Sequence, residues 1–168
     1  MAGTASTPAV AHIGIGSNLG DAQANCLKAL EALDGLKESR LIRASSLYRT
    51  EPVGYENQEW FVTCVAMLET GLSPYNLVLF MQEMEKAAGR RRVIFCGPRT
   101  LDLDLLFYED MIIRENGLTV PHPELIHRRF VLEPLREIDP GKIHPGLKKT
   151  VDELYLALHD VKQVWKIS

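Results

Sequence analysis

The sequence predicts a single α+β domain, and three observations support this class. Short apolar stretches of strand length alternate with longer segments in which apolar residues recur every three or four positions. No internal repeat or long linker divides the 168 residues. Hydrophobic residues make up 46% of the chain and charged residues 24%, an ordinary balance for a globular protein. We therefore expect one domain over residues 1–168, with residues 1–9 loosely ordered.

The first half of the chain predicts the order strand, helix, strand, strand. Val10 begins an apolar run of strand length, and Leu27, Leu30 and Leu33 then recur at the spacing of a helix face. The predicted elements are a strand at 10–15, a helix from about 20 to 36, a strand at 41–48, a loop at 49–59 with proline, glycine and asparagine, and a strand at 60–68.

The second half adds a helix, a strand and a final helix. Ser73 and Pro74 are typical first residues of a helix, and Gly89 is a typical helix stop. The predicted elements are a helix at 73–88, a loop at 90–98, a strand at 100–107, a short strand at 111–113 and a helix at 124–138. The resulting βαββαβ order is the ferredoxin-like arrangement, in which helices pack on the faces of an antiparallel sheet.

Charge and cysteine content argue against several functional classes. The net charge is −3, so we do not expect a nucleic-acid binder. Cys26, Cys64 and Cys96 have no metal-binding spacing, and we expect them to be reduced thiols of a cytoplasmic protein. We expect no signal peptide and no membrane span, since no apolar run approaches the roughly 18 residues that a span needs.

Asp102 and Asp104 give the sharpest chemical signal. In a strand, alternate side chains share a face, so Leu101, Leu103 and Leu105 would point into a core and the two carboxylates would lie together on the other face, about 7 Å apart at Cα. Hard oxygen ligands without histidine or cysteine favour Mg²⁺. The alternative is a solvent-facing strand whose acids bind nothing.

A cluster of cations precedes this pair. Lys86, Arg90, Arg91, Arg92 and Arg99 lie in a stretch without any acid, although the chain as a whole is acidic. Arginine side chains bind phosphate oxygens in a bidentate manner, so this stretch could close over a polyphosphate. The alternative is a solvated basic loop.

Three further features each have two interpretations. The glycines of residues 14–20 follow a strand, but their GxGxxxG spacing fits a tight turn better than a dinucleotide site. His122 either donates to a phosphate or is an ordinary loop histidine, and its spacing from His127 does not suit zinc. Trp60 and Phe61 either stack on a flat ring or belong to the core.

Four motifs carry a resemblance to a known family. They are GIGSNLGD at 14–21, SSLYRTEPVG at 45–54, GPRTLDLDLLF at 97–107 and VPHPELIHRRFVLEPL at 120–135. Together they resemble the 6-hydroxymethyl-7,8-dihydropterin pyrophosphokinase family, and GPRTLDLDLLF is the most specific of them. The resemblance implies a ferredoxin-like fold and, for folate biosynthesis, transfer of pyrophosphate from MgATP to the hydroxymethyl oxygen of the pterin, with release of AMP.

The same resemblance implies a role for each matching residue. The catalytic set would be Arg90, Arg92, Arg99, Asp102 and Asp104, with the two aspartates holding two Mg²⁺ ions. ATP would contact Gln82, Arg92, Arg99, Leu105, Thr119, His122 and Arg128, and Glu85 would support the site from its helix. The pterin would lie among Thr50, Pro52, Val53, Gly54 and Thr63, between the rings of Phe61 and Phe130.

Three residues depart from the family pattern. Thr63 stands where the family usually has an asparagine that binds the pterin edge, and a hydroxyl lacks the paired donor and acceptor of an amide. Cys96 replaces an aromatic residue of some members. Gly117 replaces an arginine, and Arg114 is the nearest substitute. We expect these changes to affect affinities rather than the reaction.

The sequence therefore predicts a monomeric, Mg²⁺-dependent pyrophosphokinase whose partners are two small molecules, ATP and the pterin. A different two-metal phosphoryl or nucleotidyl transferase would use the same aspartates without needing the aromatic pocket. A module that only senses small molecules would leave the acid pair and the arginine stretch unexplained.

Overall fold

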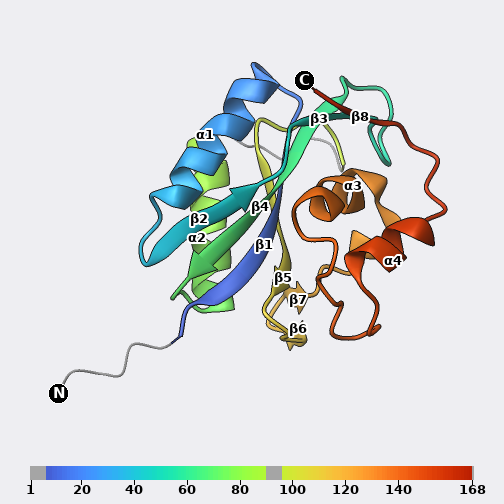
Figure 1. Cartoon of the computed structure of the whole chain (residues 1–168). Helices are drawn as coiled ribbons and strands as arrows, with labels where there is room; N and C mark the ends of the chain where they lie inside the picture. Colours follow the sequence, from blue (N-terminus) through green and yellow to red (C-terminus); the bar gives the residue numbers. More distant parts are fainter. Residues whose placement is uncertain (1–6, 90–95, 168) are drawn as a thin grey trace.

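An antiparallel sheet with helices on both faces forms the centre of the protein (Figure 1). The computed structural model describes residues 7–89 and 96–167. The strands are β1 (Ala9–Ser17), β2 (Ser39–Ala44), β3 (Tyr48–Thr50), β4 (Phe61–Thr70), β5 (Asp102–Tyr108), β6 (Ile113–Glu115), β7 (Leu118–Val120) and β8 (Val164–Lys166). The helices are α1 (Ala22–Asp34), α2 (Pro74–Ala87), the 3-10 turn η1 (Leu125–His127), α3 (Arg129–Ile138) and α4 (Val151–Leu156). Over the described residues, no helix is long and apolar enough to cross a membrane.

Strand β1 lies in the middle of the sheet and pairs antiparallel with both β4 and β5. The strand order is β5-β1-β4-β3-β8, and β2 also pairs with β4. Up to β5 the chain follows the predicted βαββαβ order except that one predicted strand is divided into β2 and β3, and the predicted fold class is confirmed. Helices α1 and α2 cover one face of the sheet, and α3 and α4 lie on the other (Figure 1).

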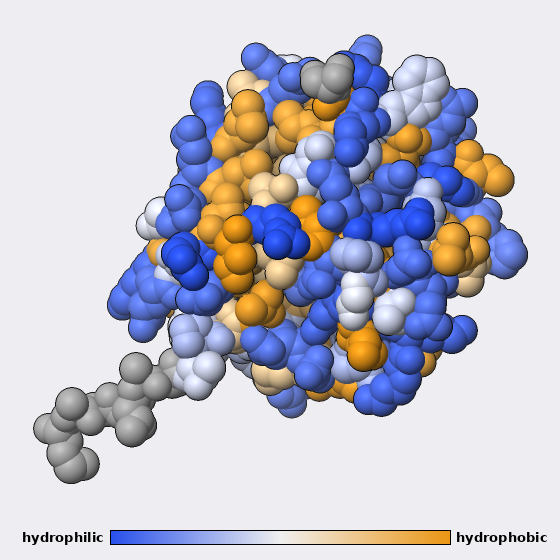
Figure 2. Space-filling model, in the orientation of Figure 1, coloured by the Kyte–Doolittle hydropathy of each residue, from blue (hydrophilic) through white to orange (hydrophobic). Residues whose placement is uncertain are grey.

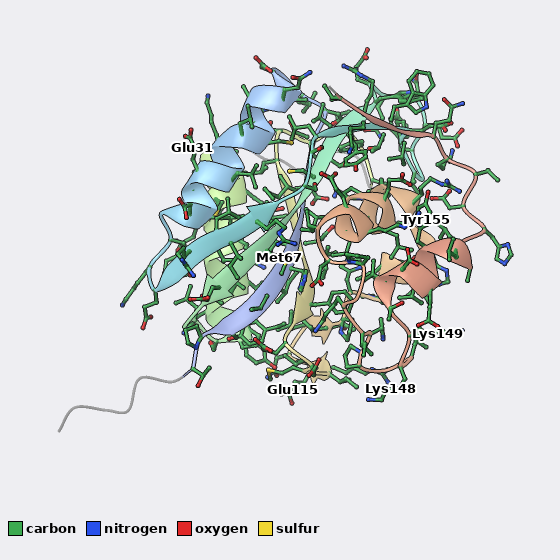
Figure 3. All side chains as sticks on the ribbon, in the orientation of Figure 1. Glu31, Met67, Glu115, Lys148, Lys149 and Tyr155 are labelled. Atoms are coloured by element: carbon green, nitrogen blue, oxygen red, sulfur yellow. The ribbon has the colours of Figure 1, made fainter. Side chains whose placement is uncertain are left out.

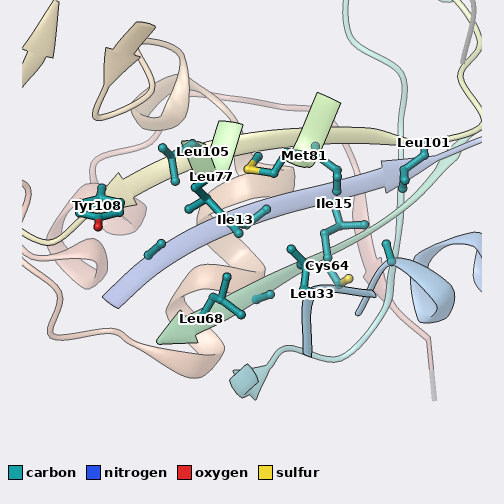
Figure 4. Close-up of a cluster of buried hydrophobic side chains, with 14 of the residues drawn as sticks. Ile13, Ile15, Leu33, Cys64, Leu68, Leu77, Met81, Leu101, Leu105 and Tyr108 are labelled. Atoms are coloured by element: carbon teal, nitrogen blue, oxygen red, sulfur yellow. The ribbon is translucent and has the colours of Figure 1, made fainter. Parts of the chain in front are cut away.

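Each face of the sheet has its own hydrophobic core. Toward α1 and α2, the cluster includes Ile13, Leu33, Leu68, Leu77 and Met81, all at most 2% exposed (Figure 4). Toward α3 and α4, the cluster consists of Val65, Leu106, Phe107, Leu125, Val131, Leu132, Leu135, Ile138, Val151 and Leu154. The outer surface in Figure 2 is mostly hydrophilic, with separate apolar patches. Burial on both faces holds the sheet in place, and with it the strand ends that form the site.

Helix α4 supports α3 through polar and aromatic contacts. Nε of Arg136 donates to Asp152 at 2.7 Å, and its guanidinium carbon lies 4.3 Å from the ring centroid of Tyr155 on α4 (Figure 3). Thr150 and Glu153 form a complete capping box at the start of α4. The sequence analysis did not predict α4 or β8, because elements of six and three residues are too short to show a hydrophobic period.

The strand predicted at 41–48 is wrong as a single element, because the structure divides it into β2 and β3. Ser45 causes the interruption: its N–H donates to Val65 O, while its Oγ, rather than its carbonyl, accepts the N–H of Val65. The N–H and hydroxyl of Ser46 donate to Glu137 on α3 instead of to the sheet. The loop predicted from residue 49 consequently begins two residues later, after β3.

Two other predicted elements need correction. The helix predicted at 124–138 is broken at Arg128, whose extended backbone (φ −120°) separates η1 from α3. The strand predicted at 111–113 lies instead at β6, which forms a hairpin with β7. Asn116 and Gly117 both have positive φ in the turn between them, so the Asn-Gly pair was an available hairpin signal.

The C-terminal end of α3 is tied to the sheet by two polar contacts. His12, 1% exposed in β1, has its Nε2 atom 2.8 Å from the Asp139 carboxylate. Nη1 of Arg43 donates to the carbonyl of Ile138 at 2.7 Å. The hydrogen bond with His12 is the main cause that lowers the pKa of Asp139.

We expect Asp139→Ala to lower the free energy of unfolding by about 1–3 kcal/mol, because it removes the partner of a buried imidazole. A carboxyl whose pKa is lowered by folding stabilises the protein above its unfolded pKa of roughly 3.9, and this contribution is lost as pH falls through the folded pKa. The difference from wild type should thus be full near neutral pH and shrink in acid.

Denaturant unfolding across this pH range measures the effect. Asp110→Ala is the control, since that side chain is 85% exposed. A difference that is the same at neutral and acid pH would contradict the role given to the Asp139 carboxylate.

Candidate active site

Asp102 and Asp104 lie at the start of β5 on the face of the sheet toward α3. Leu103 and Leu105 are buried in the cluster facing α1 and α2, so strand alternation turns the acids to the opposite face. Both carboxylates line one pocket. The predicted placement of the acid pair is therefore correct, and the pair faces a pocket rather than open solvent.

Two glycines of β1 leave space in front of the carboxylates. In the sheet register, Gly16 lies opposite Asp102 and Gly14 lies opposite Asp104. A β-carbon added at Gly16 would lie 3.6 Å from Cγ2 of Thr63 on β4, so a side chain there would occupy the pocket. Both glycines line the pocket. The first part of the glycine motif thus forms the floor of the site.

A guanidinium and an imidazole lie beside the carboxylates. Nη1 of Arg99 lies 3.0 Å from Oδ2 of Asp102, and Nε2 of His122 lies 3.8 Å from Oδ1 of Asp104. Burial, together with the neighbouring Asp102 carboxylate, raises the pKa of Asp104. Two neighbouring carboxylates fit Mg²⁺, which commonly takes one or two protein carboxylates and completes its shell with water and phosphate. Among the described residues, no group of three or more acid, histidine or cysteine side chains could hold a metal.

Aromatic and small polar side chains form the other wall. Phe61 at the start of β4 and Phe130 in the first turn of α3 line the same pocket as the acids, as do Thr50, Val53 and Thr63. Thr63 is 5% exposed, and its hydroxyl has no hydrogen-bond partner within the described part of the chain. A buried hydroxyl of this kind is available to a ligand.

Arg128 adds a second guanidinium to the pocket. It lies in the extended link before α3, lines the pocket together with Arg99, and its guanidinium carbon is 5.5 Å from the ring centroid of Phe130. The other predicted catalytic arginines, Arg90 and Arg92, belong to residues 90–95, which lie outside the described residues.

The predicted nucleotide contacts are spread around the pocket. Thr119 and His122 line a neighbouring hollow together with Arg114, the residue considered as a substitute for the family arginine. Gln82 is exposed on α2. The Leu105 side chain is buried on the opposite face of the sheet, so the structure does not bring it to the pocket.

The loop between β3 and β4 closes the pocket against Cys96. Gly54 has a φ of +85°, and a β-carbon there would lie 3.2 Å from Cβ of Cys96. Glycine satisfies both constraints. Pro52 is buried in the same loop, beside Val53 in the pocket wall. Cys96 therefore lines the pocket, at the position where some members of the similar family are expected to have an aromatic residue.

Glu85 connects α2 to the acid-bearing strand. Its Oε2 atom accepts the backbone N–H of Leu103 at 2.9 Å, at the residue between the two aspartates. The side chain is 9% exposed. Through this hydrogen bond α2 holds the strand that carries the two aspartates, which agrees with the supporting role expected of Glu85.

Asn18 joins three segments around the pocket, and the sequence analysis did not single it out. Its N–H donates to Arg99 O at 2.9 Å, and its Oδ1 accepts the N–H of Arg99 at 2.8 Å. Its amide group donates to Oε1 of Gln58 and to the carbonyl of Glu59. Gln58 donates in turn to the carbonyl of Cys96 at 2.8 Å. A polar residue directly after a buried strand was the available signal.

Comparison with known proteins decides the family. The model of the family described as 7,8-dihydro-6-hydroxymethylpterin-pyrophosphokinase (HPPK) matches residues 12–140. The chain belongs to the HPPK family. The match spans both aspartates, the pocket glycines and both phenylalanine rings, and it confirms the resemblance drawn from the four motifs.

Individual HPPK relatives agree with this assignment. The 2-amino-4-hydroxy-6-hydroxymethyldihydropteridine pyrophosphokinase of Aquifex aeolicus is 41% identical over 145 residues, which cover 86% of this chain and 89% of the relative. The protein of that name from Haemophilus influenzae is 38% identical over 92% of this chain and 96% of the relative. Folic acid synthesis protein fol1 of Schizosaccharomyces pombe is 38% identical over 86% of this chain, but this covers only 20% of its own length.

Solved structures share the HPPK fold. Wild-type HPPK-DHPS of Plasmodium falciparum has a TM-score of 0.70 at 14% identity, over 89% of this chain and 44% of that chain. A structure of HPPK-DHPS in complex with substrates has the same TM-score at 13% identity, over 89% and 43% of the two chains. The chain thus spans less than half of these structures, and at such identities they support the fold alone.

Because Asn18 ties three segments of this HPPK site, we expect Asn18→Ala to lower the free energy of unfolding by about 1–3 kcal/mol. Backbone amides around Gln58 and Arg99 should exchange hydrogen faster than in wild type. Thermal unfolding and hydrogen exchange measure the two effects, with the exposed Asn57→Ala as control. Unchanged exchange at both segments would show that the amide does not join them.

Proposed function

We propose that this chain transfers the β,γ-pyrophosphoryl group of ATP to the hydroxymethyl oxygen of 6-hydroxymethyl-7,8-dihydropterin, giving AMP and the pterin diphosphate in folate biosynthesis. One observation carries the proposal: a single pocket in a member of the HPPK family joins an acid pair, two arginines and two aromatic rings. Relatives at 38% and 41% identity bear the corresponding name.

The aromatic side of the pocket binds the pterin in this proposal. Phe61 and Phe130 stack on its two faces, which orients a flat ring without fixing a charge. The hydroxyl of Thr63, which has no partner among the described residues, hydrogen-bonds the ring edge. Thr50 at the end of β3 and the following loop with Pro52, Val53 and Gly54 close over the ring. Stacking and edge recognition together direct the hydroxymethyl group toward the acid side.

The acid side of the pocket binds ATP in this proposal. Asp102 and Asp104 hold two Mg²⁺ ions, which, when bound, neutralise charge on the phosphate oxygens. Arg99 and Arg128 contact phosphates from the pocket, and His122 and Thr119 contact the nucleotide from the neighbouring hollow. Gln82, Arg90 and Arg92 complete the proposed set, and Leu105 is left out because its side chain is buried on the opposite face of the sheet. The chain itself positions both substrates, which is the main contribution to a phosphoryl-type transfer.

The setting of the reaction follows the same proposal. We infer a monomer that acts in the cytoplasm on two small molecules and on no nucleic acid. The acidic overall charge supports the absence of nucleic-acid binding, because a net charge of −3 does not attract polyanions outside the local arginine cluster.

The test is an assay with MgATP and 6-hydroxymethyl-7,8-dihydropterin in which the nucleotide product is identified. AMP formed in a 1:1 ratio with pterin diphosphate supports pyrophosphoryl transfer. ADP as the only nucleotide product would indicate an ordinary kinase, and the absence of any pterin-dependent product would refute the proposal.

We expect Asp102→Asn and Asp104→Asn each to lower kcat by roughly 100-fold or more while the fold stays intact. Each change removes an anionic ligand at nearly constant volume, and metal-based charge stabilisation is worth several kcal/mol. Circular dichroism checks the fold, and Asp110→Asn is the matched control at an exposed aspartate. A near-normal rate for either variant at saturating Mg²⁺ would remove that residue from the metal site.

Thr63→Val tests the pterin edge at constant side-chain shape. We expect it to weaken pterin binding by about 1 kcal/mol without destabilising the protein, because the hydroxyl has no partner to lose among residues 7–89 and 96–167. Thr63→Asn, which introduces the usual family residue, should tighten binding by roughly 1 kcal/mol or less. Calorimetry with the pterin and a non-hydrolysable ATP analogue measures both. Unchanged affinity in both variants would place the substrate elsewhere.

A further inference from the structure

Residues 160–166, called the strap below, touch both sides of the pocket. They lie beyond residues 12–140, which the family model matches. In Figure 1 the C-terminal segment runs from α4 back to the sheet and ends beside β3. None of the roles proposed above uses it.

The first contact of the strap is with the start of α3. The Asp160 carboxylate accepts the backbone N–H of Arg129 at 2.9 Å, and Nη2 of Arg129 donates to the Asp160 carbonyl at 2.9 Å. Arg129 lies between Arg128 and Phe130, which both line the pocket. The strap therefore fixes the helix end that carries one guanidinium and one ring of the site.

The middle of the strap holds the loop between β3 and β4. Nζ of Lys162 forms an ion pair with Glu56 and lies 3.9 Å from Oε1 of Glu51. Two hydrogen bonds join Glu51 and Gln163: Glu51 N–H donates to Gln163 O at 3.0 Å, and Gln163 N–H donates to the Glu51 side-chain carboxylate at 2.9 Å. The Lys162 side chain is only 24% exposed, although it is a lysine near the chain end.

The last part of the strap is β8, which pairs with β3. Val164 lies opposite Thr50, a pocket residue that is 1% exposed. Trp165 contacts Trp60, the residue at which the loop enters β4, with ring centroids 6.3 Å apart. The strap thus contacts the strand before the loop at Thr50, the loop itself at Glu56 and the residue after the loop, Trp60.

We propose that Lys162 is a positioning residue for the pterin. It bridges two carboxylates of the loop that follows Thr50 and carries Pro52, Val53 and Gly54, and so holds this loop in the conformation that closes over the ring. This inference rests on the proposed function for its substrate. The predicted signature is specific, because the loop residues expected to contact substrate lie on the aromatic side of the pocket, whereas both acids lie on β5.

The kinetic test is Lys162→Met, which keeps a similar chain length without the charge. We expect KM for the pterin to rise roughly two- to fivefold, the range that a partly exposed ion pair supports, with KM for ATP and kcat nearly unchanged. Lys162→Arg should restore most of the pterin KM. Lys149→Met, before α4 and outside the strap (Figure 3), is the control for loss of a lysine charge.

A charge exchange isolates the ion pair from the fold. Lys162→Glu places a third acid beside Glu51 and Glu56 and should raise the pterin KM more than Lys162→Met does. Adding Glu56→Lys should bring it back toward the wild-type value. An unchanged pterin KM in Lys162→Met, or an equal rise in KM for ATP, would overturn the proposal, since a merely structural role affects both substrates.

A second measurement needs no substrate and separates this inference from the proposed function. Hydrogen exchange at the backbone amides of residues 51–59 should be faster in Lys162→Met than in wild type. Trp60 and Trp165 are the two tryptophans of the chain, so intrinsic fluorescence reports whether the strap is docked. Slower or equal exchange with unchanged fluorescence refutes the claim that Lys162 holds the loop. Faster exchange in a protein that makes no AMP supports that claim and refutes only the proposed pterin reaction.

Discussion

The side-chain alternation of β5 is the constraint on which the site depends. One face of the strand carries leucines whose burial is worth about 1.5–3 kcal/mol each, and the other carries Asp102 and Asp104. The acids cannot turn away from the pocket without exposing the leucines. Packing against α1 and α2 therefore sets the direction of groups on the opposite side of the sheet. The carboxylate pair is held by hydrophobic burial that it does not take part in.

The rest of the pocket comes from segments far apart in the sequence, and polar contacts hold them together. Glycines of β1 supply the floor, β4 and α3 supply the two rings, and the segment before β5 supplies Arg99. Asn18 fixes that segment to the end of β1, while His12 and Asp139 fix α3 to the sheet. These contacts are partly buried, so each is costly to break and together they give the pocket a defined shape.

Periodicity was sufficient to predict β1, β4 and β5 of the main sheet, the helices α1 and α2, and the direction of the acid pair. It failed where a polar side chain replaced a backbone partner, as at Ser45, and where a single extended residue broke a helix, as at Arg128. The two short C-terminal elements left no periodic signal. The pairing of Phe61 with Phe130 came only from the family resemblance, because no local pattern shows that a strand start and a helix start meet. Asn18 escaped notice for the same reason: its partners lie about 40 and 80 residues away.

Strand β5 is also the last strand in the sheet order, and an apolar edge strand is a template on which another chain can add a strand. Here two backbone groups of the strand already have partners outside the sheet: the N–H of Leu103 donates to Glu85, and the carbonyl of Leu106 accepts the N–H of His122. The paired aspartates add charge to the same edge. The acid pair that we propose as the metal site thus also charges the open end of the sheet, which disfavours the addition of a strand from another chain.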